Sequence, residues 1–139
     1  MKPVTPLLTV DAIIIYEGKV VLIRRMNEPH KGMFALPGGF VDVGETVETA
    51  VVREAKEETS LDVDIVKMVG VFSEPKRDAR GHTVSICYLV RGKGTPKASS
   101  DAKELQLFDF NEIPMNLAFD HSKMIEHAKN ITYGFYFCI

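Results

Sequence analysis

The chain has 139 residues, 45 % of them apolar, and carries 17 basic and 19 acidic side chains. This length and apolar content suit one domain with a single core, and we expect residues 1–139 to form it. A formal net charge of −2 excludes a general electrostatic attraction to nucleic acid or to an anionic membrane, so any polyanion must be bound by a local feature.

The predicted elements begin with a hairpin. Residues 8–16 and 20–25 are rich in Val and Ile and flank a compact connector that contains Gly18, which is typical of two antiparallel strands. Residues 26–37 are predicted to be a loop followed by a short apolar strand. A helix is then expected over 46–59, with a threonine as its N-cap.

The second half of the chain continues mostly with strands. Residues 63–72 and 83–90 are strand-like and are separated by a polar, turn-prone stretch, and 105–110 is a further strand. A last helix is expected over 120–129, capped by Asp120. This order predicts an α+β fold in which helices cover a mixed sheet, because a doubly wound nucleotide-binding fold would alternate one strand with one helix.

Cysteine usage and the first residues indicate the compartment. Cys87 and Cys138 have no CxxC spacing, which favours free thiols in a reducing compartment over a disulfide. Pro3, Pro6 and Asp11 interrupt the segment that would have to be the apolar part of a signal peptide, and no apolar run approaches the ~20 residues that span a bilayer. We therefore expect a cytoplasmic protein with no membrane or nucleic-acid partner.

The helix predicted over 46–59 carries three glutamates on its inner side. The small apolar residues that mark the face turned toward the protein body are Ala50, Val51 and Ala55. Glu54, Glu57 and Glu58 fall on the continuation of that face. A solvated acidic surface would place them on the opposite side, where Lys56 lies.

Three crowded carboxylates that point inward would each bind a proton or share a cation. Because neither Cys nor His joins them, the cation should be hard, and Mg²⁺ or Mn²⁺ fits. Gly38, Gly39 and Gly44 precede the helix and allow the backbone to pass close to such a site. The pattern therefore suggests a phosphate brought to a metal ion, and the alternative is an amphipathic helix without a metal.

These residues resemble the signature of the Nudix hydrolase family, G-x5-E-x7-R-E-U-x-E-E-x-G-U, in which U is a bulky aliphatic residue. The matching residues of this chain are Gly39, Glu45, Arg53, Glu54, Ala55, Glu57, Glu58 and Leu61. Ala55 is small for its position, and Ser60 replaces the glycine that usually ends the helix, which affects the local turn more than the metal site. The resemblance extends to "ALPGG" before the signature and to "DAKELQLFDFNEIP" after it.

The resemblance implies an α/β/α sandwich with a mixed central sheet and Mg²⁺-dependent hydrolysis of a nucleoside diphosphate linked to another moiety. The metal ligands that it implies are Gly39, Glu54, Glu57 and Glu58. Glu45 and Arg53 are implied to pair and to orient the site. The general base is Glu54 by position or Glu104, which precedes the strand at 105–110, because members of the family differ in this respect.

The stretch "SEPKRDARGHTVS" after the signature bears on the substrate. The basic side chains gathered within seven residues of it are Lys76, Arg77, Arg80 and His82. Arginine matches phosphate oxygens with two donors, although a flexible charged hairpin loop is the plainer interpretation. The stretch resembles the "SxPxRDPRGHTVS" run of archaeal and bacterial ADP-ribose pyrophosphatases, except for Ala79, and Pro75 is also associated with that group.

We therefore expect a small nucleotide substrate, ADP-ribose, cleaved to AMP and ribose 5-phosphate. The expected substrate contacts are Arg77, Arg80, His82 and Phe34. Phe34 and Phe72 are candidates to contact the adenine, although each also suits the core. The alternatives are a MutT-like pyrophosphohydrolase of oxidised nucleoside triphosphates and a non-catalytic nucleotide-binding regulatory module. Enzymes of this group are often homodimers, and the apolar tail at 131–139 suits either an interface or the chain's own core.

Overall fold

The computed structural model describes residues 2–99 and 102–131. The elements in this part of the chain are β1 (Leu7–Tyr16), β2 (Lys19–Arg25), β3 (Phe34–Ala35), β4 (Gly38–Phe40), α1 (Val47–Thr59), β5 (Asp62–Phe72), β6 (Thr83–Lys93), β7 (Ala102–Phe108) and α2 (His121–Ile131). The strands form one sheet in the order β3-β2-β1-β6-β5, with β4 also paired to β1 and β7 to β2. Strands β1 and β6 are parallel and the other pairs are antiparallel, so the predicted mixed sheet is confirmed.

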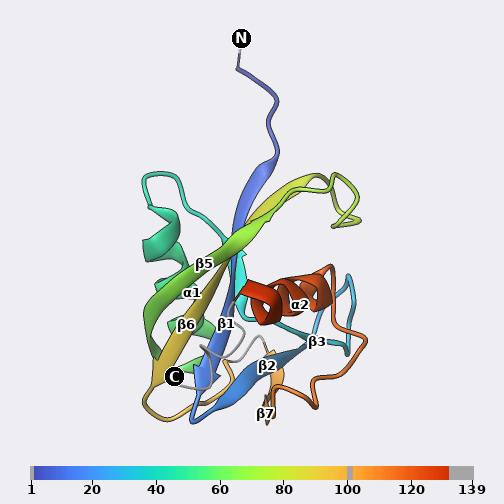
Figure 1. Cartoon of the computed structure of the whole chain (residues 1–139). Helices are drawn as coiled ribbons and strands as arrows, with labels where there is room; N and C mark the ends of the chain where they lie inside the picture. Colours follow the sequence, from blue (N-terminus) through green and yellow to red (C-terminus); the bar gives the residue numbers. More distant parts are fainter. Residues whose placement is uncertain (1, 100–101, 132–139) are drawn as a thin grey trace.

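Strand β1 shows why the sheet is covered on both sides. Val10, Ala12 and Ile14 pack into one buried cluster with α1, whereas Ile13 and Ile15 pack into a second cluster with α2. Successive side chains of a strand point to opposite faces, so one apolar strand supplies both cores. Figure 1 shows the two helices on opposite sides of the sheet, which is the predicted α/β/α sandwich.

Two predicted strands have different bounds in the structure. The single short strand expected before the first helix is a pair, β3 and β4, interrupted at Pro37, whose missing N–H cannot contribute to a ladder. The strand predicted over 105–110 begins earlier, at Ala102, and ends at Phe108, because its pairing with β2 fixes its limits. Both errors concern boundaries that long-range pairing sets rather than local sequence.

The residue before α2 does not act as the prediction assumed. Asp120 directly precedes the helix, but its carboxylate accepts hydrogen bonds from Nε and Nη2 of Arg77 at 2.9 and 2.7 Å. The expected side-chain cap is therefore replaced by a tertiary ion pair with the β5–β6 loop.

Both ends of α1 have recognisable caps. Thr46 accepts a hydrogen bond from the Thr49 backbone N–H at 3.1 Å, as predicted for an N-cap. Ser60 adopts the left-handed conformation with φ 66°, and its N–H donates to Lys56 O at 2.9 Å. A serine thus occupies a conformation that favours glycine.

Ser60→Gly is expected to raise the free energy of unfolding by up to about 1 kcal/mol, because glycine adopts the left-handed conformation without a Cβ penalty. The gain is limited by the flexibility that glycine adds to the unfolded chain and by the loss of the 3.3 Å bond from Ser60 Oγ to Lys97 O. Urea unfolding at neutral pH measures the change. Ser60→Ala is the control, since it removes the hydroxyl and keeps the Cβ; equal stability of the two variants would contradict the prediction.

Two structural observations concern the expected compartment. Neither α1 nor α2, in the part of the chain that the structure describes, has the length and apolar character needed to cross a bilayer. Cys87 is buried and its thiol is free. Cys138 and the end of the apolar tail, residues 132–139, lie outside the described residues.

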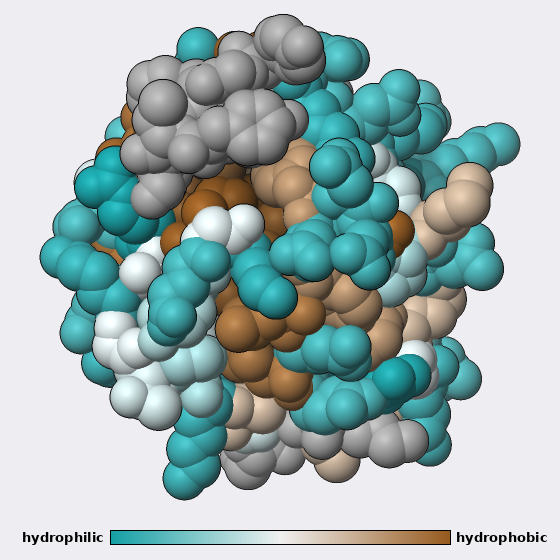
Figure 2. All heavy atoms as spheres, turned by 60° about the horizontal axis from the view of Figure 1, so that its bottom comes forward, coloured by the Kyte–Doolittle hydropathy of each residue, from teal (hydrophilic) through white to brown (hydrophobic). Residues whose placement is uncertain are grey.

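One face of the molecule shows apolar atoms at its surface. Figure 2 views the structure from below relative to Figure 1, and apolar side chains gather in the middle of this face within a rim of polar ones. More than half of the accessible surface of an ordinary monomer is apolar, so such a patch does not identify a partner by itself. The homodimer therefore stays a prediction.

Candidate active site

Strand β4 and helix α1 bring two glutamates against two glycines. Glu58 Oε1 accepts a hydrogen bond from the Gly38 N–H at 2.7 Å. A Cβ on Gly39 would lie 2.5 Å from the Glu54 carboxylate, and a Cβ on Gly38 would lie 2.2 Å from Val10 O. Only glycine fits at Gly38, where the obstacle is backbone, and a Cβ on Gly39 would displace the Glu54 carboxylate, so the segment lies close against the acidic side of α1.

Burial changes the acidity of both glutamates. It raises the pKa of Glu58 to about 8, helped by the charges of Glu54 and Asp11 and opposed by the hydrogen bond from Gly38. Burial also raises the pKa of Glu54, although Arg53 acts in the opposite direction. Both groups are therefore poorly solvated as carboxylates, which is the condition in which a bound cation stabilises them most.

Glu57 does not face inward as the helical periodicity predicted. Its side chain is 58 % exposed, and Oε2 accepts a hydrogen bond from Arg53 Nη1 at 3.2 Å. The residue lies at the margin of the apolar stripe, where attraction to a cation on the preceding turn decides the direction of a long side chain. The predicted inward cluster is thus two half-buried glutamates with a third at their exposed edge.

Arg53 connects the loop before α1 to the glutamates. Its Nε and Nη2 donate to Oε2 and Oε1 of Glu45 at 2.7 and 2.9 Å, and Nη2 also donates to Phe40 O at 3.0 Å. Its Nη1 donates to Glu54 Oε1 at 2.9 Å. The hydrogen bonds from Arg53 and from the Asp42 N–H lower the pKa of Glu45 to about 2. The pairing of Glu45 with Arg53 that the sequence suggested is therefore present.

The donor set fits a hard divalent cation. Within residues 2–99 and 102–131, no three His, Cys, Asp or Glu side chains are already arranged as a metal cage. However, Glu54 and Glu58 are crowded, half-buried carboxylates with raised pKa values, and Glu57 borders them. Oxygen donors of this kind are those that Mg²⁺ and Mn²⁺ prefer.

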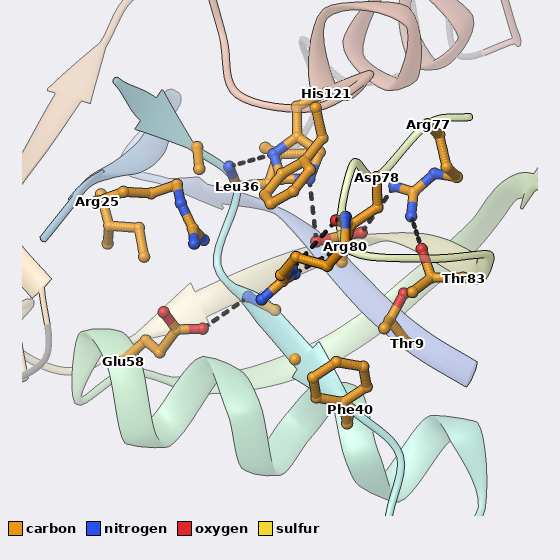
Figure 3. Close-up of a pocket in the computed structure, with 16 residues that line it drawn as sticks. Thr9, Arg25, Leu36, Phe40, Glu58, Arg77, Asp78, Arg80, Thr83 and His121 are labelled. Carbon is orange, nitrogen blue, oxygen red and sulfur yellow. Dashed lines mark hydrogen bonds and ion pairs between the residues drawn. The ribbon is translucent and has the colours of Figure 1, made fainter. Parts of the chain in front are cut away.

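A pocket of about 200 Å³ opens beside Glu58, between β1, Gly38 and Gly39 (the glycine segment), the β5–β6 loop and the start of α2. Figure 3 shows Arg25 and Arg80 around this opening together with Glu58. The guanidinium carbons of Arg25 and Arg80 lie 4.9 and 5.6 Å from the centre of the Phe119 ring. Burial, followed by the charge of Arg80, lowers the pKa of Arg25, so an anion between the two guanidinium groups would be stabilised.

The β5–β6 loop places its two arginines differently. Arg80 is half exposed and is held by Asp78, to which Nε and Nη2 donate at 3.1 and 2.8 Å. Arg77 has a side chain only 4 % exposed, and its guanidinium binds Asp120 and, at 2.7 Å, Thr83 Oγ1. Arg80 is thus oriented at the pocket. Arg77 also lines the pocket, but its guanidinium is bound by Asp120 and Thr83, so its role as a substrate contact stays a prediction.

Two of the predicted substrate contacts, His82 and Phe34, lie away from the pocket. His82 is exposed, and its Nε2 lies 3.1 Å from Ser73 O. Phe34 packs against the buried cluster under α2, with its ring 5.2 Å from that of Phe108 and with the Arg24 guanidinium 4.4 Å above it. Neither is among the residues that line the described pocket, and Phe34 is a core aromatic, as is Phe72.

The second candidate for the general base is engaged elsewhere. Glu104 lies on β7 opposite Arg24 of β2, and its carboxylate accepts a hydrogen bond from Arg24 Nε. Neither Glu104 nor Glu54 is among the residues that line the described pocket, but the Glu54 carboxylate lies against Gly39. The structure therefore brings Glu54, and not Glu104, to the glycine segment.

Sequence reasoning missed several residues at the pocket, namely Asp11, Arg25, Phe119 and His121. Arg25 directly follows Arg24 in β2, so the two side chains point to opposite faces of the sheet. The sequence does not show which of the two faces a site. The positive φ of Phe119, 53°, is visible only in the structure. The sequence offers one signal, the adjacent ionisable residues Asp120 and His121, of which only Asp120 enters the prediction, as a helix cap.

The comparison with protein families agrees with this architecture. A NUDIX domain model matches residues 5–128, and the chain therefore belongs to the Nudix hydrolase family. Members of the family act on small nucleotide substrates and generally need a divalent metal ion.

Three of the similar proteins have names that mention ADP-ribose. An ADP-ribose pyrophosphatase of Methanocaldococcus jannaschii is 53 % identical over 122 residues, which cover 87 % of this chain and 72 % of that protein. An ADPR responsive transcriptional repressor of Acinetobacter baylyi is 31 % identical over 133 residues, 89 % of this chain and 53 % of that protein. The solved NUDIX domain of Shewanella oneidensis NrtR, complexed with ADP ribose, has a TM-score of 0.79 and 31 % identity, and the match covers 91 % of this chain and 88 % of that one.

Proposed function

We propose that this protein hydrolyses ADP-ribose to AMP and ribose 5-phosphate, with Mg²⁺ as the metal ion and Mn²⁺ as a substitute. The observation that carries the proposal is that Glu58 and the two guanidinium groups of Arg25 and Arg80 face one pocket. A diphosphate in that pocket meets Glu58, which has Glu54 beside it, on one side and fixed positive charge on the other. The 53 % identical ADP-ribose pyrophosphatase supports the choice of substrate.

The residues proposed to hold the metal ion are Gly39, through its carbonyl, and Glu54, Glu57 and Glu58. The bound ion supplies Lewis-acid neutralisation of charge on the phosphate oxygens and a more acidic water nucleophile. Glu45 and Arg53 hold this side of α1 in place, because Arg53 binds Glu45, Glu54 and Glu57 together. Arg80, fixed by Asp78, and Arg25 orient the diphosphate.

Glu54 is proposed as the general base. Its side chain is 14 % exposed, lies against Gly39 and is oriented by Arg53, so it is suited to accept a proton from a water that attacks phosphorus. The attack breaks one P–O bond of the diphosphate bridge, and the two phosphomonoesters leave as products. Glu104 is not needed for this role, because its carboxylate is bound by Arg24.

Product analysis tests the proposal. The purified protein is incubated with ADP-ribose, NADH, a dinucleoside polyphosphate and 8-oxo-dGTP, each with Mg²⁺ and with EDTA, and the products are separated by chromatography. Selective formation of AMP and ribose 5-phosphate, abolished by EDTA, is the expected result. A nucleoside monophosphate and pyrophosphate from 8-oxo-dGTP would instead establish the MutT-like alternative.

A regulatory module is the second candidate, because the Acinetobacter baylyi relative is named as a repressor that responds to ADPR. The two functions share a ligand and differ in turnover. Calorimetric titration of ADP-ribose with Ca²⁺ or without metal measures binding separately from cleavage. Tight binding with no product in Mg²⁺ would favour the regulatory module over the enzyme.

Glu57→Gln is expected to lower the turnover of ADP-ribose by about 100-fold, because a metal ligand that neutralises phosphate charge contributes several kcal/mol to the transition state. The exposed position of Glu57 predicts a change in the free energy of unfolding within about 0.5 kcal/mol. Steady-state kinetics and urea unfolding measure the two effects. Glu48→Gln, an equivalent change at an exposed site of the same helix, is the control and should keep full activity; equal turnover of both variants would remove Glu57 from the metal site.

A further inference from the structure

A cluster of buried polar side chains lies at the inner end of the pocket. We call it the Asp11 cluster, and its members are Asp11, Arg77, Thr83, Ser85, Asp120 and His121. Asp11, Thr83, Ser85 and His121 are each at most 7 % exposed. Buried polar groups are costly unless they are paired, so a cluster of this size in a small domain suggests a specific task.

His121 is at the centre of this cluster and uses both ring nitrogens. Nδ1 accepts a hydrogen bond from the Leu36 backbone N–H at 3.0 Å, and Nε2 lies 3.3 Å from Asp11 Oδ1. Because Nδ1 is an acceptor, the ring proton is on Nε2 and points to Asp11. Figure 3 shows the imidazole reaching from α2 to Leu36. With both nitrogens engaged by the protein, His121 is suited to position other groups and not to react with substrate.

Asp11 is a fixed partner for this histidine. Its Oδ2 accepts a hydrogen bond from Ser85 Oγ and lies 3.9 Å from Arg77 Nη2. Burial acts to raise the pKa of Asp11, but the interactions with His121, Ser85 and Arg77 outweigh it and hold the pKa below the ordinary value. The carboxylate is therefore ionised and held on three sides, so it fixes the orientation of the imidazole.

The Leu36 N–H, which donates the hydrogen bond to His121, lies in the gap between β3 and β4, residues 36–37. Leu36 is buried, and its N–H donates to the imidazole and not to a neighbouring strand. On the next residue, Pro37 O accepts a hydrogen bond from the Ala12 N–H at 2.8 Å. Residues 36–37 are thus bonded to β1 on one side and to α2 on the other. The hydrogen bond to α2 is made by one side chain, that of His121.

The next two residues of this segment meet the glutamates. The Gly38 N–H donates to Glu58, and Gly39 lies against Glu54 so closely that a Cβ would overlap with the carboxylate. Gly38 has equally little room, because its Cβ would lie 2.2 Å from Val10 O. A displacement of Leu36 is therefore transmitted to the donor that holds Glu58, and misplacement of about 1 Å can cost a factor of 100 in rate.

We propose that His121 is a positioning residue for the metal-binding glutamates, acting through the Leu36 N–H and the glycine segment. The inference rests on the proposed function only in assigning Glu54 and Glu58 to a divalent cation. Partners that orient metal ligands from outside the coordination shell typically contribute a factor of 10 to 100 in metal affinity or activity. The Asp11 cluster is thus assigned to the metal site, although none of its members is itself assigned as a ligand.

Three substitutions of His121 separate its two contacts. In His121→Asn the amide oxygen replaces Nδ1 and can accept from Leu36, whereas in His121→Gln the amide reaches the position of Nε2 and can donate to Asp11. His121→Ala removes both contacts. His127→Asn is the matched control, because His127 is an exposed histidine of the same helix.

Mn²⁺ binding is measured without nucleotide by electron paramagnetic resonance of the free ion, and amide exchange of Leu36 and Gly38 is measured in the metal-free protein. His121→Ala and His121→Gln should bind Mn²⁺ about 10- to 100-fold more weakly and exchange both amides faster, whereas His121→Asn and His127→Asn should stay close to the wild type. Turnover of ADP-ribose should fall in the same two variants, with little change in KM.

Wild-type Mn²⁺ affinity in a folded His121→Gln variant would overturn the positioning role, as would an equal loss in His121→Asn. If His121→Ala does not fold, the comparison of Asn with Gln decides the matter. A wild-type protein that binds Mn²⁺ but leaves ADP-ribose intact would refute the proposed substrate. The Mn²⁺ affinities of the variants would then decide the role of His121. A wild-type protein that does not bind Mn²⁺ would overturn both.

Discussion

Glu58→Gln is expected to remove nearly all turnover of ADP-ribose, by a factor on the order of 10²–10³, while leaving the protein folded. The glutamine removes a proposed metal ligand, but its amide oxygen can still accept the hydrogen bond that Glu58 Oε1 receives from Gly38. The loss should therefore appear in kcat and in the concentration of Mg²⁺ needed for half activity. Near-normal turnover would exclude Glu58 from the metal site.

The same substitution should change how stability depends on pH in the metal-free protein. Burial raises the pKa of Glu58 from 4.5 to about 8 in the folded state, so between these values the folded protein binds a proton that the unfolded chain does not. Stability from this group is complete below about pH 4.5 and is lost as the pH rises through about 8. Glu58→Gln removes that loss, so it should be the more stable protein at pH 8 by a few kcal/mol at most.

Urea unfolding in EDTA at several values between pH 5 and pH 8 measures this dependence. The wild-type free energy of unfolding should fall more steeply with pH than that of Glu58→Gln, and the two curves should approach each other at pH 5. Parallel curves would show that Glu58 ionises without cost in the folded protein, contrary to its burial beside Glu54 and Asp11.

The direction of the metal-site helix could be predicted because it depends on local periodicity. The small apolar residues of α1 are buried, and Glu54 and Glu58 follow the same face toward β4. Glu57 could not be placed in this way, since it lies at the margin of the face and the attraction of Arg53 moves it outward. Helical spacing predicts a direction to within a fraction of a turn, and ion pairs determine the rest.

The β5–β6 loop shows where local sequence is not sufficient. Four basic side chains within seven residues suggested a phosphate-binding loop, but Arg77 is neutralised by Asp120, which is 43 residues further along the chain. Arg25 presents the opposite case, because nothing in its neighbourhood in the sequence predicts that it lies at the pocket with Arg80. The fold pairs Arg77 with a carboxylate distant in the sequence and brings Arg25 to the pocket. The residues next to each arginine in the sequence predict neither outcome.

Arg77→Met is expected to lower the free energy of unfolding by about 3–5 kcal/mol, the usual cost of removing one partner of a buried ion pair. The guanidinium is 4 % exposed and binds both oxygens of Asp120, whose side chain is 13 % exposed, so the substitution leaves a poorly hydrated carboxylate at the start of α2. It also removes the 2.7 Å hydrogen bond to Thr83 Oγ1. Urea unfolding at pH 7 in EDTA measures the loss.

The double variant Arg77→Met/Asp120→Asn tests whether the cost comes from the unpaired charge. Asparagine removes the charge of Asp120 and nearly keeps its shape, so the double variant should be more stable than Arg77→Met alone, which independent effects would not produce. Lys93→Met is the control, because Lys93 and Asp64 form an ion pair at 2.9 Å with side chains 63 % and 61 % exposed. Exposed pairs contribute about 0–1 kcal/mol, so similar losses in Arg77→Met and Lys93→Met would show that burial of the Arg77 pair has no energetic consequence.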